Sequence, residues 1–146
     1  MMGEVESMPA PRLIIFVKAP RPGTVKTRLA RSIGSEPAAA AYRLLVERLL
    51  SSLRGIKPVE LRFAPDDSRT EIQPWLQPTW AAQPQGAGDL GHRMRIAFAD
   101  AFALGIKKVV LIGSDCPSVT PADIQTAWER LHEADVVLGP AADGGY

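Results

Sequence analysis

Two patterns of hydrophobic residues alternate along this chain. Continuous apolar runs rich in β-branched residues occupy residues 12–19 and 107–117, as is typical of parallel strands that are buried on both faces. Residues 57–65 alternate between apolar and polar positions, and residues 134–141 form a last apolar run. The pattern therefore predicts four strands, with residues 78–84 as a candidate for a short additional one.

Between these runs, apolar residues recur at the three- and four-residue spacing of amphipathic helices. One predicted helix, with Ser35 as its N-cap and Gly55 as its stop, buries Tyr42, Leu45, Val46, Leu49, Leu50 and Leu53. A second, ending near Gly105, buries Leu90, Met94, Ala97, Phe98, Ala101 and Phe102. A third runs to about His132 and opens with an N-cap, a first-turn proline and an acidic third residue at Thr120, Pro121 and Asp123.

Strands that alternate with helices predict an α/β fold with a mostly parallel sheet. Ligands of such sheets bind beyond the carboxyl ends of the strands. We expect one domain over residues 12–146, because the chain contains no internal repeat, low-complexity tract or interdomain linker. Residues 1–11 contain acidic residues and no apolar signal-peptide core, so we expect them to be a disordered leader.

Composition narrows the classes of partner. Of the 146 residues, 46% are hydrophobic and 23% are charged, which suits one ordinary core, and the net charge is only +1. This balance argues against a nucleic-acid or membrane binder, so any attraction for phosphate is local. No apolar run approaches the roughly 18 residues of a membrane span, and the single cysteine, Cys116, fits a reducing compartment. We therefore expect a cytoplasmic protein.

A basic loop, "FVKAPRPGTVKTRLA" at residues 16–30, follows the first predicted strand. Its four cations are Lys18, Arg21, Lys26 and Arg28. Gly23 allows close approach of backbone to a ligand, and a helix starting between Thr24 and Lys26 would point N–H groups and a positive dipole end toward it. The loop departs from the Walker A pattern, because Val25 stands where that pattern requires glycine directly before the lysine, and Pro20 and Pro22 stiffen the loop. Either the loop binds polyphosphate, or it is a solvated turn whose cations face water.

The motif "GSDCP" at residues 113–117 follows the clearest buried strand. Asp115 therefore lies at the edge of the sheet where ligands bind. It is either a ligand of a hard cation such as Mg²⁺ or a turn cap, although Thr120 already caps the following helix. Cys116 is either a small core residue or, less favoured because no histidine is paired with it locally, a nucleophile.

Two further motifs are ambiguous on their own. In "DGGY", Asp143 with Gly144 and Gly145 offers a carboxylate and accessible backbone to a substrate, but suits a type I′ or II′ turn equally well. In "QGAGDLGHRM", Asp89 and Arg93 begin a helix. They are either an N-cap and a solvated cation, or contacts to a nucleobase or acceptor.

These four motifs, taken in order, resemble a bacterial family of nucleotide-diphospho-sugar-transferase-like proteins with the GT-A fold. The family includes glycosyltransferase-like proteins associated with radical-SAM and selenodomain proteins, and it is similar to 2-phospho-lactate guanylyltransferase. The resemblance covers residues 12–146 and implies a three-layer α/β/α Rossmann-like fold with a mixed sheet. The family domain continues past "DGGY", so the chain resembles a truncated domain, and a second copy of it is a candidate cover for the exposed sheet edge.

The resemblance also implies roles for individual residues. The phosphate-binding loop matches the segment from Lys18 to Arg28, and Asp115 matches the metal-binding aspartate, with Asp143, Gly144 and Gly145 as a second substrate or metal element. The candidate catalytic residues are Lys26, Arg28 and Asp115. The candidate substrate contacts are Lys18, Pro20, Gly23, Thr24, Asp89, Arg93, Asp143, Gly144 and Gly145.

Three activities are compatible with these residues. In the leading one, Mg²⁺ or Mn²⁺ held by Asp115 and Asp143 bridges the phosphates of a nucleoside triphosphate, Lys26 and Arg28 stabilise the leaving pyrophosphate, and a small-molecule acceptor attacks the α-phosphorus. In the second, the same cleft binds a nucleotide-diphospho-sugar and transfers the sugar. In the third, the chain binds a nucleotide without turnover.

Overall fold

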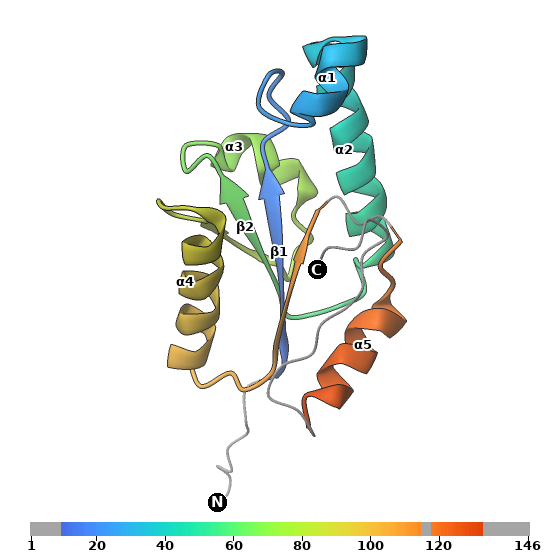
Figure 1. Ribbon diagram of the computed structural model, residues 1–146. Helices are drawn as coiled ribbons and strands as arrows, with labels where there is room; N and C mark the ends of the chain where they lie inside the picture. The colour runs from blue at the N-terminus through green and yellow to red at the C-terminus, as the bar shows by residue number, and fades with distance from the viewer. Residues whose placement is uncertain (1–9, 115–117, 133–146) are drawn as a thin grey trace, which may run out of the picture.

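The computed structural model describes residues 10–114 and 118–132. Within this part of the chain, four parallel strands form one sheet in the order β3-β2-β1-β4 (Figure 1). The strands are β1 (Arg12–Lys18), β2 (Val59–Ala64), β3 (Ala81–Pro84) and β4 (Val109–Gly113). The predicted α/β fold with a mostly parallel sheet is confirmed, and residues 78–84 do contain a short strand. The strand predicted at residues 134–141 and most of the predicted leader lie outside the described residues.

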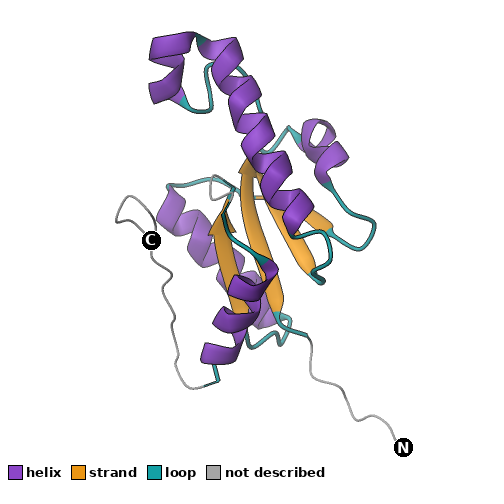
Figure 2. Ribbon diagram, turned by 90° about the vertical axis from the view of Figure 1, so that its right-hand side faces the viewer, coloured by secondary structure: helices purple, strands orange, loops and turns teal. Residues whose placement is uncertain are grey.

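Helices cover both faces of the sheet and form the three layers that the fold class implies. They are α1 (Thr27–Ile33), α2 (Ser35–Ser52), α3 (Arg69–Ile72), the 3₁₀ helix η1 (Gln73–Trp75), α4 (Leu90–Ala103) and α5 (Pro121–Arg130). Figure 2 shows α2 and α5 in front of the sheet and α4 behind it. None of the helices in the described part of the chain is long and apolar enough to cross a membrane.

The two cores follow from the alternation of side chains along β1. Leu13, Ile15 and Val17 pack into the larger core, under α2 and α5. Ile14 and Phe16 pack into the smaller core, under α4. All five side chains are buried, which explains why the sequence of this strand is apolar throughout rather than alternating.

A buried ion pair of β2 lies on the same side of the sheet as the smaller core. Arg62 and Glu60 are exposed by only 4% and 6%, and Nε of Arg62 donates to Oε1 of Glu60 at 2.8 Å. A second carboxylate, that of Asp100 on α4, lies 3.1 Å from Nη2 of Arg62. Since both buried charges have partners, the strand tolerates them in a position that otherwise favours apolar residues.

The start of α5 is confirmed in detail. The hydroxyl of Thr120 accepts a hydrogen bond from the backbone N–H of Asp123, and the carboxylate of Asp123 accepts one from the N–H of Thr120. This reciprocal capping box leaves no unpaired donor at those positions.

The helix expected to start near Thr24 to Lys26 has Lys26 as its N-cap and Thr27 as its first residue. Two other local predictions are wrong. Ser35 is the first residue of α2 rather than its N-cap, because Gly34, at φ 98°, occupies the cap position. Leu90 and Phe102 are each 54% exposed rather than buried, because the contact of α4 with the sheet centres on the small residues Ala97 and Ala101.

Candidate functional site

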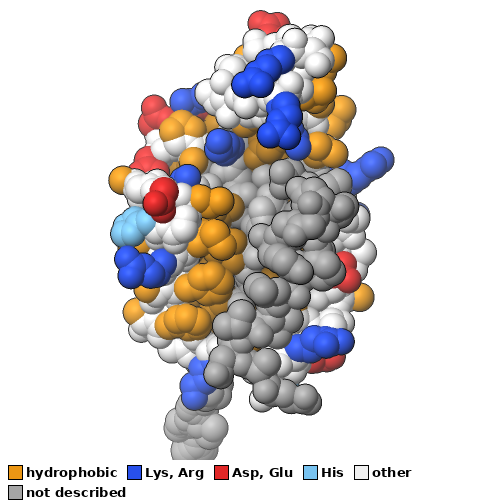
Figure 3. Space-filling view, in the orientation of Figure 1, with side chains coloured by type: hydrophobic (Ala, Val, Ile, Leu, Met, Phe, Trp, Pro, Cys, Tyr) orange, Lys and Arg blue, Asp and Glu red, His pale blue; other side chains and the backbone are white. Residues whose placement is uncertain are grey.

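The basic loop lies at the carboxyl edge of the sheet. It leaves β1 directly after Lys18 and leads into α1, which contacts α2. Lys18 and Arg28 are exposed and Lys26 is half-buried. Figure 3 shows Lys and Arg side chains over this end of the molecule. The structure therefore places Lys18, Lys26 and Arg28 where the fold binds ligands.

A tight turn shapes the loop between Pro20 and Thr24, which are half-buried and exposed, respectively. Both the backbone N–H and the hydroxyl of Thr24 donate to the carbonyl oxygen of Arg21, at 3.1 and 2.7 Å. Gly23 lies at φ +87°, and a Cβ added there would meet no heavy atom within 4 Å. The turn thus needs glycine for its positive φ and leaves open space beside it.

Arg21 holds the loop against α3. Its Nε donates to Glu71 at 2.8 Å, and its Nη2 lies 3.1 Å from Oδ1 of Asp67. The hydrogen bond from Arg21 lowers the pKa of the Glu71 carboxyl, and the same bond raises the pKa of the guanidinium. Because two carboxylates compensate its charge, Arg21 serves to position the loop and is a poor candidate for binding phosphate.

Lys26 has an unusual backbone. It is the only non-glycine residue with positive φ in the described part of the chain, at φ 49° and ψ 47°, and it forms the N-cap of α1 without a side-chain cap bond. Left-handed conformations of larger residues cost energy, and they are found more often at functional sites than elsewhere. No sequence pattern predicted this conformation.

A buried tyrosine joins the ends of β1 and β4. The hydroxyl of Tyr42, on α2, accepts a hydrogen bond from the backbone N–H of Lys18 at 2.9 Å and lies 2.8 Å from the hydroxyl of Ser114. Tyr42 and Ser114 are each only 6% exposed. Sequence reasoning assigned Tyr42 to the core only, but its hydroxyl fixes the two chain segments that precede the basic loop and Asp115.

A second polar junction joins β1, β2 and α4. Nε2 of Gln85 donates to the carbonyl oxygens of Val17 and Arg62, both at 3.0 Å. Its Oε1 accepts a hydrogen bond from Nη1 of Arg93 at 2.5 Å. Sequence reasoning missed Gln85, although its place beside the predicted strand end at 78–84 was a usable signal.

Asp89 has a structural role that the sequence left open. Its carboxylate accepts the backbone N–H of His92 at 2.8 Å and caps α4. The neighbouring Gly88 lies at φ +101°, and a Cβ there would come within 2.7 Å of Cδ2 of His92. The cap accounts for the carboxylate of Asp89, and the contact of Asp89 with a substrate stays a prediction.

The expected metal ligands are not tested by these contacts. Asp115, Cys116, Asp143, Gly144 and Gly145 lie outside the described residues. Among the described residues, no group of three His, Cys, Asp or Glu side chains could hold a metal ion. The metal-binding role of Asp115 and Asp143 stays a prediction, made because carboxylates are the ligand type that Mg²⁺ and Mn²⁺ prefer.

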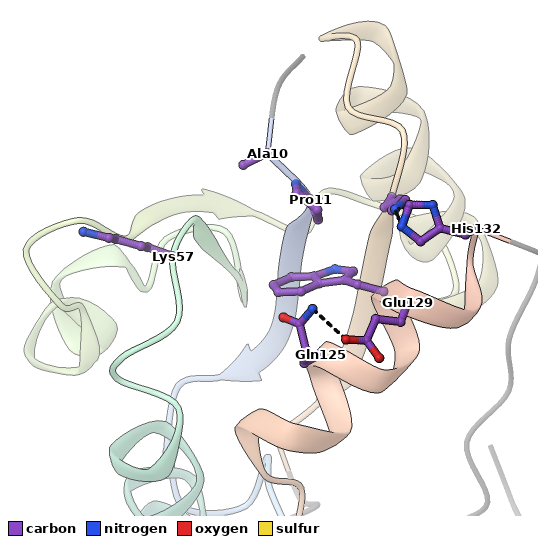
Figure 4. A pocket seen from close by; sticks show the side chains of 8 residues that line it. Ala10, Pro11, Lys57, Gln125, Glu129 and His132 are labelled. Atoms are coloured by element: carbon purple, nitrogen blue, oxygen red, sulfur yellow. Dashed lines mark hydrogen bonds between the residues drawn. The ribbon is translucent and has the colours of Figure 1, made fainter. Parts of the chain in front are cut away.

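A cavity of about 250 Å³ lies at the other end of the sheet, near the amino ends of β1 and β4 (Figure 4). Trp128 of α5 forms part of its wall, and Nε2 of Gln125 donates to Glu129 at 3.3 Å beside it. Lys108 contacts His132 at its rim. Since parallel α/β sheets bind their ligands at the opposite edge, we place the candidate site at the basic loop.

Comparison with known proteins gives the family. Residues 50–146 match the family described as "Uncharacterized protein conserved in bacteria (DUF2064)". The chain belongs to this family. No curated protein matches it.

A crystal structure from Desulfovibrio desulfuricans G20, described as a "putative nucleotide-diphospho-sugar transferase", is similar to this DUF2064 member over 93% of the present chain. The two share 37% sequence identity and superpose with a TM-score of 0.84. The matched region spans 60% of the length of that structure. The similarity confirms the fold and supports the nucleotide-sugar-transferase part of the resemblance, while the radical-SAM and guanylyltransferase parts stay predictions.

Proposed function

We propose that this chain binds a nucleotide-diphospho-sugar at the carboxyl edge of its sheet and supports transfer of the sugar to a small-molecule acceptor. The observation that carries the proposal is the basic loop, which leaves β1 at Lys18 and enters α1 with Lys26 in a left-handed conformation. The 37% identity with the structure described as a "putative nucleotide-diphospho-sugar transferase" supports the choice of substrate class.

The roles we assign follow from charge. Lys18, Lys26 and Arg28 contact the diphosphate and stabilise the negative charge that develops on it when the sugar leaves. Among the described residues, no carboxylate forms an ion pair with Lys18 or Arg28, whereas Arg21 is paired twice. The positive charges of Lys18 and Arg28 are therefore available to a ligand.

A divalent cation is part of the proposal. Asp115 and Asp143 would hold Mg²⁺ or Mn²⁺, which supplies charge neutralisation to the departing diphosphate. Support for this part of the proposal comes from Ser114, the residue before Asp115 in the sequence, because Tyr42 bonds both to its hydroxyl and to the backbone N–H of Lys18 at the end of β1.

Binding measurements on the full chain test the proposal. With Mg²⁺ or Mn²⁺ present, uridine and guanosine diphospho-sugars or triphosphates should bind more tightly than the monophosphates, because the loop's charge acts on several phosphates at once. Lys26→Ala should weaken this binding by about 1–3 kcal/mol, the scale of a hydrogen bond to a charged group. Lys107→Ala is the matched control, since Lys107 is exposed next to the amino end of β4. Equal affinity for the monophosphates and the diphospho-sugars, or unchanged binding by Lys26→Ala, would contradict the proposal.

Product analysis separates this activity from the other two. Release of a nucleoside diphosphate indicates sugar transfer. Release of pyrophosphate from a triphosphate indicates nucleotidyl transfer, the activity that the sequence motifs favour. Tight binding with neither product indicates a nucleotide-binding module.

A further inference from the structure

Gln85 is a buried polar side chain whose hydrogen bonds fix the orientation of its amide. It is 4% exposed and directly follows β3. Both of its amide N–H donations go to backbone carbonyl oxygens, those of Val17 on β1 and Arg62 on β2. These acceptors fix the orientation of the amide, because only its nitrogen can donate to them. The amide oxygen must therefore face the other way, toward Arg93.

Arg93 is held by neutral acceptors. Nη1 donates to Oε1 of Gln85 at 2.5 Å, and Nε donates to the backbone carbonyl of Asp89 at 3.3 Å. In the described part of the chain, no carboxylate forms an ion pair with this guanidinium, in contrast to Arg21 and Arg62. A guanidinium has five N–H donors, so three remain beyond these two bonds. Arg93 is thus a half-buried cation with a fixed geometry and an uncompensated charge.

Gln85 links Arg93 to the strand end from which the basic loop departs. Gln85 contacts the carbonyl of Val17, and Val17 is the residue before Lys18. Through this amide, α4 is tied to the end of the strand from which the basic loop departs. Arginine binds phosphate and carboxylate groups with paired donors, and its fork needs a fixed orientation to do so.

We propose that Gln85 is a positioning residue that holds Arg93 as a contact for a phosphate group of the ligand at this edge of the sheet. The inference rests on the proposed function for the class of ligand, and it adds a second anion contact on an element separate from the basic loop. Gln85 acts through Arg93 and does not itself touch the ligand.

Nuclear magnetic resonance of the ¹⁵N-labelled full chain tests the contact directly. The Nε–Hε signal of Arg93, assigned by its loss in Arg93→Lys, is followed during titration with pyrophosphate and, separately, with UDP-glucose, each with Mg²⁺. We expect a saturable shift of this signal with at least one probe and no shift for Arg95, an exposed arginine two residues along the same helix. A shift with pyrophosphate locates phosphate itself as the group bound, and a shift with UDP-glucose alone shows that the nucleotide is needed to deliver it.

Variants test the positioning role. Arg93→Gln should lower the affinity for the responding probe about tenfold or more, the range for a lost charged hydrogen bond, and Arg95→Gln should leave it unchanged within about twofold. Gln85→Met should lower the affinity as well, and the double variant Gln85→Met/Arg93→Gln should bind no more weakly than Arg93→Gln alone, because Gln85 acts through Arg93. Circular dichroism confirms that each variant is folded. Gln85→Glu, which keeps the side-chain length and gives Arg93 a carboxylate partner, should also weaken binding.

The outcomes separate this inference from the proposed function. An Arg93 signal that responds to neither probe overturns the inference, whether or not a nucleotide binds at the basic loop. A response of Arg93 combined with normal binding by Lys26→Ala overturns the role of the basic loop and leaves the inference standing. Binding by Gln85→Met or Gln85→Glu as tight as that of the parent refutes the positioning role.

Discussion

The hydroxyl of Tyr42 links the two chain segments that enter the candidate site, and its removal is the most informative test of the site's architecture. Tyr42→Phe keeps the buried ring and so leaves the packing of α2 on the sheet intact. It removes the acceptor for the N–H of Lys18 and the partner of the Ser114 hydroxyl, at 2.9 and 2.8 Å. Groups left unsatisfied in buried surroundings cost about 1–3 kcal/mol. We expect the free energy of unfolding to fall by this amount.

Urea denaturation of four proteins measures the effect: the parent, Tyr42→Phe, Ser114→Ala and the double variant. Because both single variants break the same bond, their effects should not add, and the coupling energy should be about 0.5–1.5 kcal/mol. Tyr42→Phe should also weaken binding of the nucleotide ligand, since the backbone of Lys18 loses its anchor, whereas Ser114→Ala leaves that bond in place. Additive effects, or a loss of stability below about 0.5 kcal/mol, would refute the account of this junction.

Two further predictions concern the loops. Arg21 lowers the pKa of Glu71, so this ion pair should stabilise the fold fully above about pH 4.5, the ordinary pKa of the carboxyl. Its contribution should be lost as the pH falls through the lowered pKa. Thermal unfolding should show this loss of stability at acid pH in the parent and not in Arg21→Gln. Gly88→Ala should lower the free energy of unfolding by about 1 kcal/mol or more because of its positive φ, whereas Gly55→Ala, which has neither a positive φ nor a close contact, should be nearly neutral in urea denaturation.

The sequence predicted the sheet because its signals are local and strong. The run around Leu13 to Val17 has no polar position, and all of these residues are buried between two helical layers. The capping box at Thr120 was equally readable, since both partners lie three residues apart. The buried face of helix α4 was predicted less accurately. The spacing of Leu90 and Phe102 indicates a helical face but not how far the sheet extends beneath it.

The site could be predicted only in part, for a physical reason. Lys18, Lys26 and Arg28 were visible as a basic cluster after a strand. The bond between Tyr42 and Ser114 spans 72 residues, and that between Gln85 and Val17 spans 68, so neither leaves a local pattern. The bond between Arg21 and Glu71 spans 50 residues and also leaves no local pattern. In the sequence Arg21 resembles a phosphate contact, whereas in the structure it holds the loop against α3.

The central claim is that a divalent cation held by Asp115 strengthens the binding of a nucleotide at the carboxyl edge of the sheet. Isothermal titration of Asp115→Asn with UDP-glucose, with and without Mg²⁺, tests it most directly, because the amide keeps the size and turn-capping capacity of the carboxylate and removes its charge. Asp123→Asn is the matched control, since that carboxylate serves the cap of α5. We predict that the Mg²⁺-dependent part of the affinity disappears in Asp115→Asn and persists in Asp123→Asn. Full Mg²⁺-enhanced binding by Asp115→Asn would contradict the account.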